Sequence, residues 1–423
     1  MKARVIIPLA LLLSTFPFTL HSQMSWQKYE SNPVIASSNH LGISGMPDDI
    51  FAFTPCVVAQ DGGYRMWYSG MRGYYDFSIS EAWSNDGRRW FVSKVPVLSP
   101  GGFDATGLRG PCVVKRPGGY NMYYYTGSGS SLKIGLATSE DGNTWTKYEG
   151  NPVLAPGEAG SWESVGVWAP MVTFEGGRFR MWYEGFDGQW ASIGHATSED
   201  GIHWTKDGAN PVVPHGSSPD FDFRSAGEPR VLRIRFQYLL FYTGTNGSQS
   251  NSVGLATSRD GRTWTKHGPV LLPTAGAWDR SHTAACAVVL KDETLHMWYS
   301  GGSGSDWQIG YASCPYRTED VDPLDQSALR IRSNYPNPFN PITTLSFVVP
   351  TAGRVRIVIY DMLGRVVRQL VDREMADGER TITWDGTADN GSQVASGSYV
   401  SRIEFLPPGA TPSSAVQKMM IVR

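Results

Sequence analysis

Cysteine, charge and long apolar runs are all scarce in this sequence, and each shortage excludes a class of protein. The four cysteines form no Cys-x-x-Cys or Cys/His pattern, so nothing predicts a structural zinc site. Charged residues make up 18% of the chain and the formal net charge is −2, which gives no electrostatic reason to expect nucleic acid or an anionic membrane as a partner. Beyond the N-terminal region, no apolar run approaches the roughly 18 residues of a membrane-spanning helix, so no transmembrane segment is expected.

The N-terminus has the three-part build of a secretory signal peptide. Lys2 and Arg4 precede the apolar run VIIPLALLLSTFPF, and the polar stretch HSQ follows it. We expect residues 1–22 to be removed near Ser22. The mature protein is then secreted or held on the outer surface of the cell.

Aromatic residues, glycine and proline are abundant, and the sequence repeats itself. The chain has 15 Trp, 47 Gly and 27 Pro, a mixture typical of short strands joined by tight turns. The motif Asp-Gly-x-x-Trp recurs at 86–90, 141–145, 200–204 and 260–264. Alternating apolar runs flank each motif, so Asp-Gly predicts a hairpin turn.

Each repeat contains four predicted strands, and five repeats can be traced. An all-β fold follows, with a five-bladed β-propeller over residues 23–318. The fifth repeat lacks the Asp-Gly-x-x-Trp motif, and WQKYESNPV at 26–34 resembles WTKYEGNPV at 145–153. We therefore expect the N-terminal segment to supply the outermost strand of the fifth blade. Three cysteines, Cys56, Cys112 and Cys286, fall at matching repeat positions, which favours small buried residues over a disulfide framework.

After residue 318 the repeats stop. Residues 319–332 are predicted to be a polar linker, and a different small β-sandwich occupies 333–423. The motifs YPNPFNP and YDMLGR there resemble the immunoglobulin-like C-terminal sorting domain of the bacterial type IX secretion route, and are similar to the domain of flagellar hook-capping proteins. This resemblance implies delivery across an outer membrane, with the type IX machinery as a partner.

Comparing equivalent positions of the repeats separates residues that the fold requires from candidate functional residues. An acid recurs ahead of every inner strand and is interpreted as structural: Asp48, Asp104, Glu163, Asp222 and Asp279. The residue just before the inner-strand proline differs among blades: Thr54, Gly110, Ala169, Glu228, and Ala284 or Ala285 in the fifth. Only Glu228 is ionisable there. At the end of the second strand the residues are Ser69, Thr126, Glu184, Thr243 and Ser300, and only Glu184 is acidic.

Propeller topology brings the loops before the inner strands to one face around the axis. The candidate residues there are Asp48, Asp49, Arg109, Trp168, Glu184, Glu228, Arg280 and His282, with Tyr74, Tyr75, Trp190 and Trp307 as aromatic walls. Acids bind hydroxyl groups and aromatic faces stack on sugar C–H faces, so a carbohydrate ligand is predicted. Two carboxyls about 6.5–9.5 Å apart can also hydrolyse a glycosidic bond.

The segments SWESVGVWAPMV, FRMWYEG and GEPRVL, with the repeated ATS-x-DG-x-x-W, resemble the five-bladed glycoside hydrolases and the related mannoside phosphorylases. The resemblance implies Glu228 as the general acid and Asp49, or its neighbour Asp48, as the base. The middle-blade acid of that group is missing at Ala169, so Glu184 would substitute for it. No cofactor is expected, although the resemblance allows an axial cation such as calcium near His282.

Three functions stay open from the sequence. The first is a hydrolase for oligosaccharides or polysaccharides with catalytic Glu228, Asp49 and Glu184. The second is a glycan-binding propeller without catalysis, in which Trp168 and Trp190 carry affinity. The third is a phosphorylase in which four arginines bind phosphate: Arg109, Arg224, Arg230 and Arg280.

Overall fold

A computed structural model describes residues 24–37, 48, 50–60, 62–72, 76–128, 131–234, 237–247, 250–304, 306–316, 329–407 and 412–422. The chain divides into two compact units, Met1–Thr318 and Glu319–Arg423. The predicted signal peptide, most of the predicted linker, Asp49, Tyr74 and Tyr75 lie outside the described residues. Nearly all regular structure is β, and no helix in the described part is long and apolar enough to cross a membrane.

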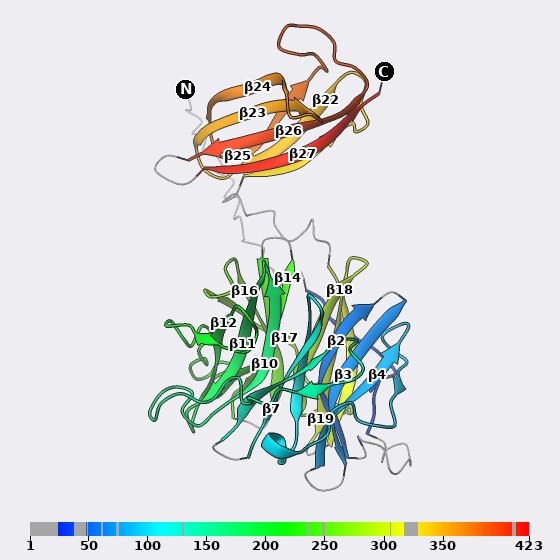
Figure 1. Ribbon diagram of the computed structural model, residues 1–423, viewed down its shortest axis with the longest axis vertical. Coiled ribbons are helices and arrows are strands. Elements are labelled where there is room, and N and C mark those ends of the chain that lie inside the picture. Colours follow the sequence, from blue (N-terminus) through cyan, green and yellow to red (C-terminus); the bar gives the residue numbers. More distant parts are fainter. Residues whose placement is uncertain are drawn as a thin grey trace, which may run out of the picture. The chain divides into compact units, whose positions relative to one another are not determined.

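The strands of the first unit pair into five antiparallel groups, each corresponding to one sequence repeat (Figure 1). Group one has β2 (Phe51–Gln60), β3 (Gly63–Arg72), β4 (Asp76–Ser84) and β5 (Phe91–Val92). Group two has β6 (Arg109–Arg116), β7 (Gly119–Thr126), β8 (Lys133–Ser139) and β9 (Thr146–Lys147). Group three has β10 (Gly166–Glu175), β11 (Arg178–Phe186), β12 (Ala191–Ser198) and β13 (Thr205–Lys206). Group four has β14 (Ser225–Ile234), β15 (Gln237–Thr245), β16 (Asn251–Ser258) and β17 (Thr265–Leu271).

Group five combines β18 (His282–Lys291), β19 (Thr294–Ser303) and β20 (Asp306–Pro315) with β1 (Gln27–Lys28). The first strand of each group contacts the first strand of the next, and β18 contacts β2, so these inner strands form a closed ring. The unit is therefore propeller-like, and its inner strands surround the site.

The predicted role of the N-terminal segment is confirmed. Gln27 and Lys28 pair with Ser313 and Ala312 of β20. The Lys28 Nζ atom lies 2.5 Å from the Asp279 carboxylate, and the Trp26 ring packs edge-on against Phe241 of group four. Trp26 thus takes the place of the missing fifth motif tryptophan.

The Asp-Gly-x-x-Trp turns join neighbouring groups. In the third turn, the Asp200 carboxylate accepts bonds from the backbone N–H groups of Ile202 and His203. The glycine carbonyl then accepts from the preceding group, as Gly201 does from the Tyr123 hydroxyl at 2.8 Å. The motif tryptophan packs edge-on against the same neighbour, since Trp204 contacts Tyr123. The other three motif tryptophans pack against a neighbouring group in the same way, so the motif serves packing between groups.

The recurring acids are structural, as expected. Four of them accept a hydrogen bond from the tyrosine 20 residues later, for example Tyr242 to Asp222 at 2.9 Å and Tyr68 to Asp48 at 2.8 Å. In group four Lys266 also binds Asp222, at 2.6 Å. Asp48 is buried in this scaffold contact.

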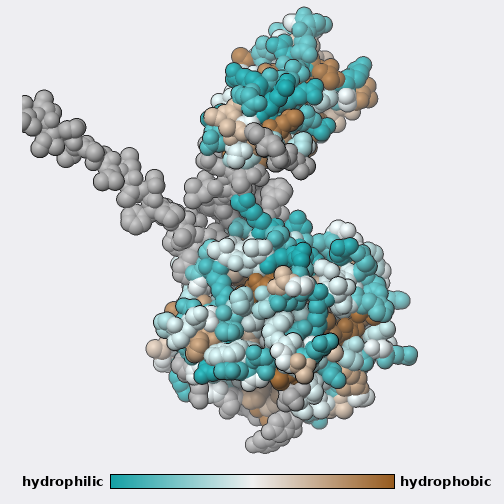
Figure 2. Space-filling model, turned by 90° about the vertical axis from the view of Figure 1, so that its left-hand side faces the viewer, coloured by the Kyte–Doolittle hydropathy of each residue, from teal (hydrophilic) through white to brown (hydrophobic). Residues whose placement is uncertain are grey.

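The second unit consists of two small sheets. One contains β21 (Arg330–Tyr335), β22 (Thr343–Val349) and β25 (Gly378–Trp384); the other contains β24 (Val366–Met375), β23 (Gly353–Asp361), β26 (Gly397–Leu406) and β27 (Ser413–Ile421). Side chains from both sheets share a core in which Phe347, Ile357 and Ile403 are fully buried. This arrangement fits an immunoglobulin-like domain. On the face seen in Figure 2, hydrophilic surface predominates over small apolar patches.

Candidate active site

Every inner strand bends at one residue, and Glu228 is that residue in group four. The strand register shifts there in all five groups, which marks a β-bulge. The bulge residues have positive φ angles: Thr54 50°, Gly110 59°, Ala169 47°, Glu228 46° and Ala285 39°. In the fifth group the bulge residue is therefore Ala285. The left-handed conformation costs a non-glycine residue roughly 1–2 kcal/mol, and at Glu228 it directs a carboxyl group toward the centre of the ring.

The N–H group of a bulge residue donates to a side chain of the preceding group. Ala285 N–H donates to the Thr243 hydroxyl at 2.8 Å, and Thr54 N–H donates to the Ser300 hydroxyl at 2.8 Å. In group four the same bond runs from Glu228 N–H to the Glu184 carboxylate at 2.9 Å. Glu184 thus stands where groups one, four and five use a short hydroxyl side chain.

The strand register corrects one equivalence in group two. Arg109 pairs with Tyr125 as Trp168 pairs with Glu184, so Tyr125 and not Thr126 corresponds to Glu184. The prediction was wrong because strand β7 has one more residue ahead of its glycine than its counterparts. Tyr125 is a residue that sequence reasoning missed, and correct alignment of the repeats would have found it.

Two glycines make room for these larger side chains. A Cβ atom on Gly227 would lie 2.2 Å from the carboxyl carbon of Glu184. A Cβ atom on Gly110 would lie 2.6 Å from the Tyr125 ring. Neither distance is possible between non-bonded carbon atoms, so each glycine permits the side chain beside it.

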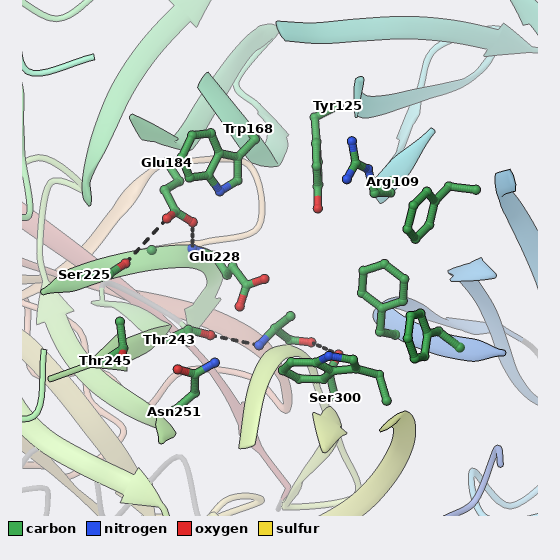
Figure 3. A pocket seen from close by; sticks show the side chains of 16 residues that line it. Arg109, Tyr125, Trp168, Glu184, Ser225, Glu228, Thr243, Thr245, Asn251 and Ser300 are labelled. Carbon is green, nitrogen blue, oxygen red and sulfur yellow. Dashed lines mark hydrogen bonds between the residues drawn. The ribbon is translucent and has the colours of Figure 1, made fainter. Parts of the chain in front are cut away.

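A cavity of about 400 Å³ opens inside this ring (Figure 3). Its lining comes from all five groups: Phe51, Phe53, Phe77, Arg109, Tyr125, Trp168, Glu184, Ser225, Gly227, Glu228, Thr243, Thr245, Asn251, Ala285, Ser300 and Trp307. Figure 3 shows Glu184, Glu228 and Trp168 on one side of the cavity, with Arg109 and Tyr125 across from Glu228. The predicted residues Arg109, Trp168, Glu184 and Glu228 are thus brought together.

Burial and mutual repulsion hold a proton on the two glutamates. Burial, and after it the charge of Glu228, raise the pKa of Glu184 to about 8, against the hydrogen bonds from Glu228 N–H, Trp168 and Ser225, which lower it. Burial also raises the pKa of Glu228, although a hydrogen bond from Thr243 and the charge of Arg230 oppose this. The pair therefore carries a proton at neutral pH, as closely placed carboxyls do.

The other predicted site residues lie away from the cavity lining. Trp190 is half-buried, and its ring is stacked on His215 at 4.9 Å while the Arg224 guanidinium lies 5.0 Å over it. His282 stacks behind the lining residue Trp307, with 4.8 Å between ring centroids. Arg280 is exposed, Asp48 is bound by Tyr68, and Asp49 is outside the described residues.

The arginines proposed to bind phosphate are scattered. Arg109 lines the cavity, whereas Arg224 covers Trp190 and Arg280 is exposed. Arg230 is buried and donates to the carbonyl oxygens of Pro170 and Pro229.

Arg230 places a positive charge among the inner strands, which disfavours a second cation beside it. Within the described residues, no group of three or more His, Cys, Asp or Glu could hold a metal ion. The axial cation near His282 that the resemblance allows stays a prediction.

The thiols are free and serve contacts between groups. Cys56 accepts from Val113 N–H at 3.3 Å, and Cys112 accepts from Val172 N–H at 3.1 Å. Cys286 follows its bulge residue directly and corresponds to the prolines of the other groups, so its predicted equivalence to Cys56 was off by one residue.

Comparison with known proteins supports this description of the two units. The model of the FlgD Ig-like domain matches residues 344–404. Among solved structures, a glycoside hydrolase aligns with a TM-score of 0.56 and 18% identity, covering 66% of this chain and 90% of its own. A structure from the GH130 family of mannoside phosphorylases, which contains glycoside hydrolases that target β-1,2 mannosidic linkages in Candida mannan, aligns with a TM-score of 0.55 and 19% identity over 69% of this chain and 93% of its own. These two likenesses show the fold.

Sequence relatives also match the first unit. Beta-1,2-mannobiose phosphorylase of Thermoanaerobacter sp. is 27% identical over 142 residues, which are 30% of this chain and 46% of the relative. Uncharacterized protein Rv1502 of Mycobacterium tuberculosis is 30% identical over 224 residues, which are 48% of this chain and 72% of the relative. The chain therefore belongs to the same protein family as Rv1502 of Mycobacterium tuberculosis.

Proposed function

We propose that the first unit is a five-bladed propeller enzyme that cleaves glycosidic bonds of oligosaccharides or polysaccharides in the cavity around Glu228. One observation carries the proposal: two of the ring positions that elsewhere hold small or hydroxyl side chains hold carboxyls here, in adjacent groups and in one cavity. The scaffold does not require these acids, because Ala285 and Thr243 make the same contact. The names of the relatives, glycoside hydrolase and mannobiose phosphorylase, support the same class of bond.

Glu228 is the candidate proton donor to the leaving glycosidic oxygen. It faces the cavity, and its environment favours the protonated form. Glu184 touches the backbone of Glu228 and is fully enclosed, so it is placed to set the protonation and position of Glu228 and not to activate water. Hydrolysis needs a second carboxylate on the other side of the bond, and Asp49 remains the candidate for that role.

The test is product release by the full chain from a panel of glycans, measured as reducing ends. We expect Glu228→Gln to lower the rate by about 10²–10⁴ while sugar binding survives. The control is Glu199→Gln, an exposed glutamate paired with Arg178, which should leave the rate unchanged. If wild type and Glu228→Gln are equally inactive on every glycan but still bind sugar, the protein is a glycan-binding propeller.

Phosphorolysis is the second candidate, because two relatives are named phosphorylases. Among the four arginines proposed as phosphate ligands, the structure places only Arg109 at the cavity. A rate that depends on added phosphate, with sugar 1-phosphate as the product, would establish it in place of hydrolysis.

We also propose that the protein is exported and that the second unit is the sorting signal for this export. The apolar N-terminal run and the motifs YPNPFNP and YDMLGR support this. Mass spectrometry of the protein from its native host should show cleavage near Ser22. Removal of residues 319–423 should leave the first unit inside the cell envelope, and normal export of the truncated chain would contradict the proposal.

A further inference from the structure

The cavity is electrostatically divided. The two glutamates share one side, and Arg109 lies across from Glu228 (Figure 3). Around Arg109 the wall is aromatic, because Phe77 and Tyr125 lie under and over its guanidinium group at 4.8 and 5.2 Å. These rings fix the plane of the guanidinium group.

Arg109 is held in place but incompletely bonded. Its Nη2 donates to the Gly127 carbonyl oxygen at 2.8 Å. Its Nε–H is buried and has no acceptor, and none of the carboxylates in the described ranges forms an ion pair with the guanidinium. Arg109 therefore lines the cavity with N–H capacity that the protein itself leaves unused.

We infer that the sugar bound next to the glutamates carries a carboxylate, as a uronic acid does, and that Arg109 binds this group. The inference rests on the proposed function, because it uses the same cavity. Arginine presents planar N–H donors that match a carboxylate, and the aromatic walls fix their direction. One ligand would then bind both sides of the cavity. Its glycosidic oxygen would accept a proton from Glu228, and its carboxylate would accept hydrogen bonds from Arg109.

The separation of charge across the cavity favours an anion over a neutral hydroxyl beside Arg109. With a proton on the glutamate pair, the second glutamate and Arg109 leave the lining near neutrality, but the opposite charges lie on different sides of the cavity. A hydrogen bond to a charged group is stronger than one to a neutral hydroxyl. That difference predicts a preference of about tenfold or more for the acidic sugar.

The experiment uses the full chain carrying Glu228→Gln, which prevents turnover, and measures binding by calorimetry. The probes are pairs of methyl glycosides that differ only at C6, the glucoside against the glucuronide, and likewise for galactose and mannose, in both anomers. We expect at least one uronide to bind about tenfold tighter than its neutral partner. Adding Arg109→Gln should reduce this ratio to near one, and Arg109→Lys should keep part of it.

Arg224→Gln is the matched control, because Arg224 is exposed and covers Trp190 away from the cavity lining. It should leave the ratio unchanged. Melting temperatures identify variants that do not fold, and Arg109→Lys keeps the test valid if Arg109→Gln is unstable. The inference is overturned if neutral glycosides bind as tightly in every pair, or if Arg109→Gln weakens both members of a pair equally.

Inorganic phosphate is the other source of an anion. If millimolar phosphate stabilises the wild type but not Arg109→Gln, and uronides show no preference, the anion is phosphate and the uronide inference fails. Cleavage of neutral glycans without a uronide preference would overturn the inference and leave the proposed function intact. Tight, Arg109-dependent uronide binding without cleavage of any uronide by wild type would support the inference and contradict the proposed function.

Discussion

Two junctions of the ring make the same contact with different chemistry. Between groups four and five, the Ala285 N–H donates to the Thr243 hydroxyl. Between groups three and four, the Glu228 N–H donates to the Glu184 carboxylate, at nearly the same distance. The backbone bulge and the direction of the bond are shared, so the scaffold accounts for the geometry. What remains is a pair of acids that the fold does not need, and this difference identifies the site.

Replacing Glu228, so that the junction between groups three and four resembles that between groups four and five, should have the largest effect on activity. Glu228→Ala places there the residue that groups three and five carry at the bulge. Because alanine adopts the same positive φ at Ala169 and Ala285, we expect the protein to fold with little change in stability. Activity should fall by about 10²–10⁴ through loss of the proton donor. Rates on the preferred glycan and the urea midpoint measure the two effects, and retained activity would remove Glu228 from the mechanism.

Gly227→Ala should be the next most damaging change, and it tests why a glycine is there. The new Cβ atom would overlap the Glu184 carboxyl, so the side chain must move. We expect a loss of about 2 kcal/mol in unfolding free energy and at least tenfold in rate. The equivalent residue in group five is Ala284, which directly precedes the bulge residue whose N–H bonds Thr243.

The double variant Gly227→Ala, Glu184→Thr copies that junction except at the bulge residue, which stays Glu228. Its stability should recover to within about 0.5 kcal/mol of wild type, while its activity stays low. If the double variant is as unstable as Gly227→Ala alone, the overlap with Glu184 is not the reason for the glycine.

Glu184→Gln should change how stability depends on pH. The pKa of Glu184 rises from 4.5 to about 8 on folding, so the folded state holds this proton more tightly than the unfolded chain. Such a group stabilises the fold fully below about pH 4.5, and the contribution is lost as pH rises through 8. We expect wild type to lose about 3 kcal/mol between pH 5 and 8 beyond any change seen in Glu184→Gln. Urea titrations at several pH values measure this, and parallel curves for the two proteins would refute it.

Much of the fold was predictable from the sequence because the five repeats of the chain can be compared with one another. The recurring Asp-Gly-x-x-Trp motif predicted the hairpins, and WQKYESNPV predicted the strand that completes group five. The same comparison singled out Glu228 and Glu184, since their types break a pattern set by the other repeats.

What the sequence did not reveal depends on register and on packing. Tyr125 was missed because one extra residue in β7 shifts the alignment, and side-chain register is fixed by strand pairing. Trp190 was expected to face a sugar, but His215 and Arg224 come from later segments and cover it. No local pattern indicates such long-range stacking.

Trp168→Phe should produce the smallest of these effects and the most specific one. Trp168 donates a hydrogen bond that lowers the pKa of Glu184, and a phenyl ring keeps the packing against Phe186 but has no donor. The pKa of Glu184 should therefore rise further, and the pH at which wild type loses stability should move upward by less than about one unit, since one unit corresponds to about 1.4 kcal/mol. At the junction between groups five and one, the Ser300 hydroxyl bonds only backbone groups of Thr54 and Ala285, so Ser300→Ala should lower stability at all pH values without moving the curve. A downward shift in Trp168→Phe would mean that the indole acts by excluding water, because loss of a pure donor cannot favour the ionised carboxylate.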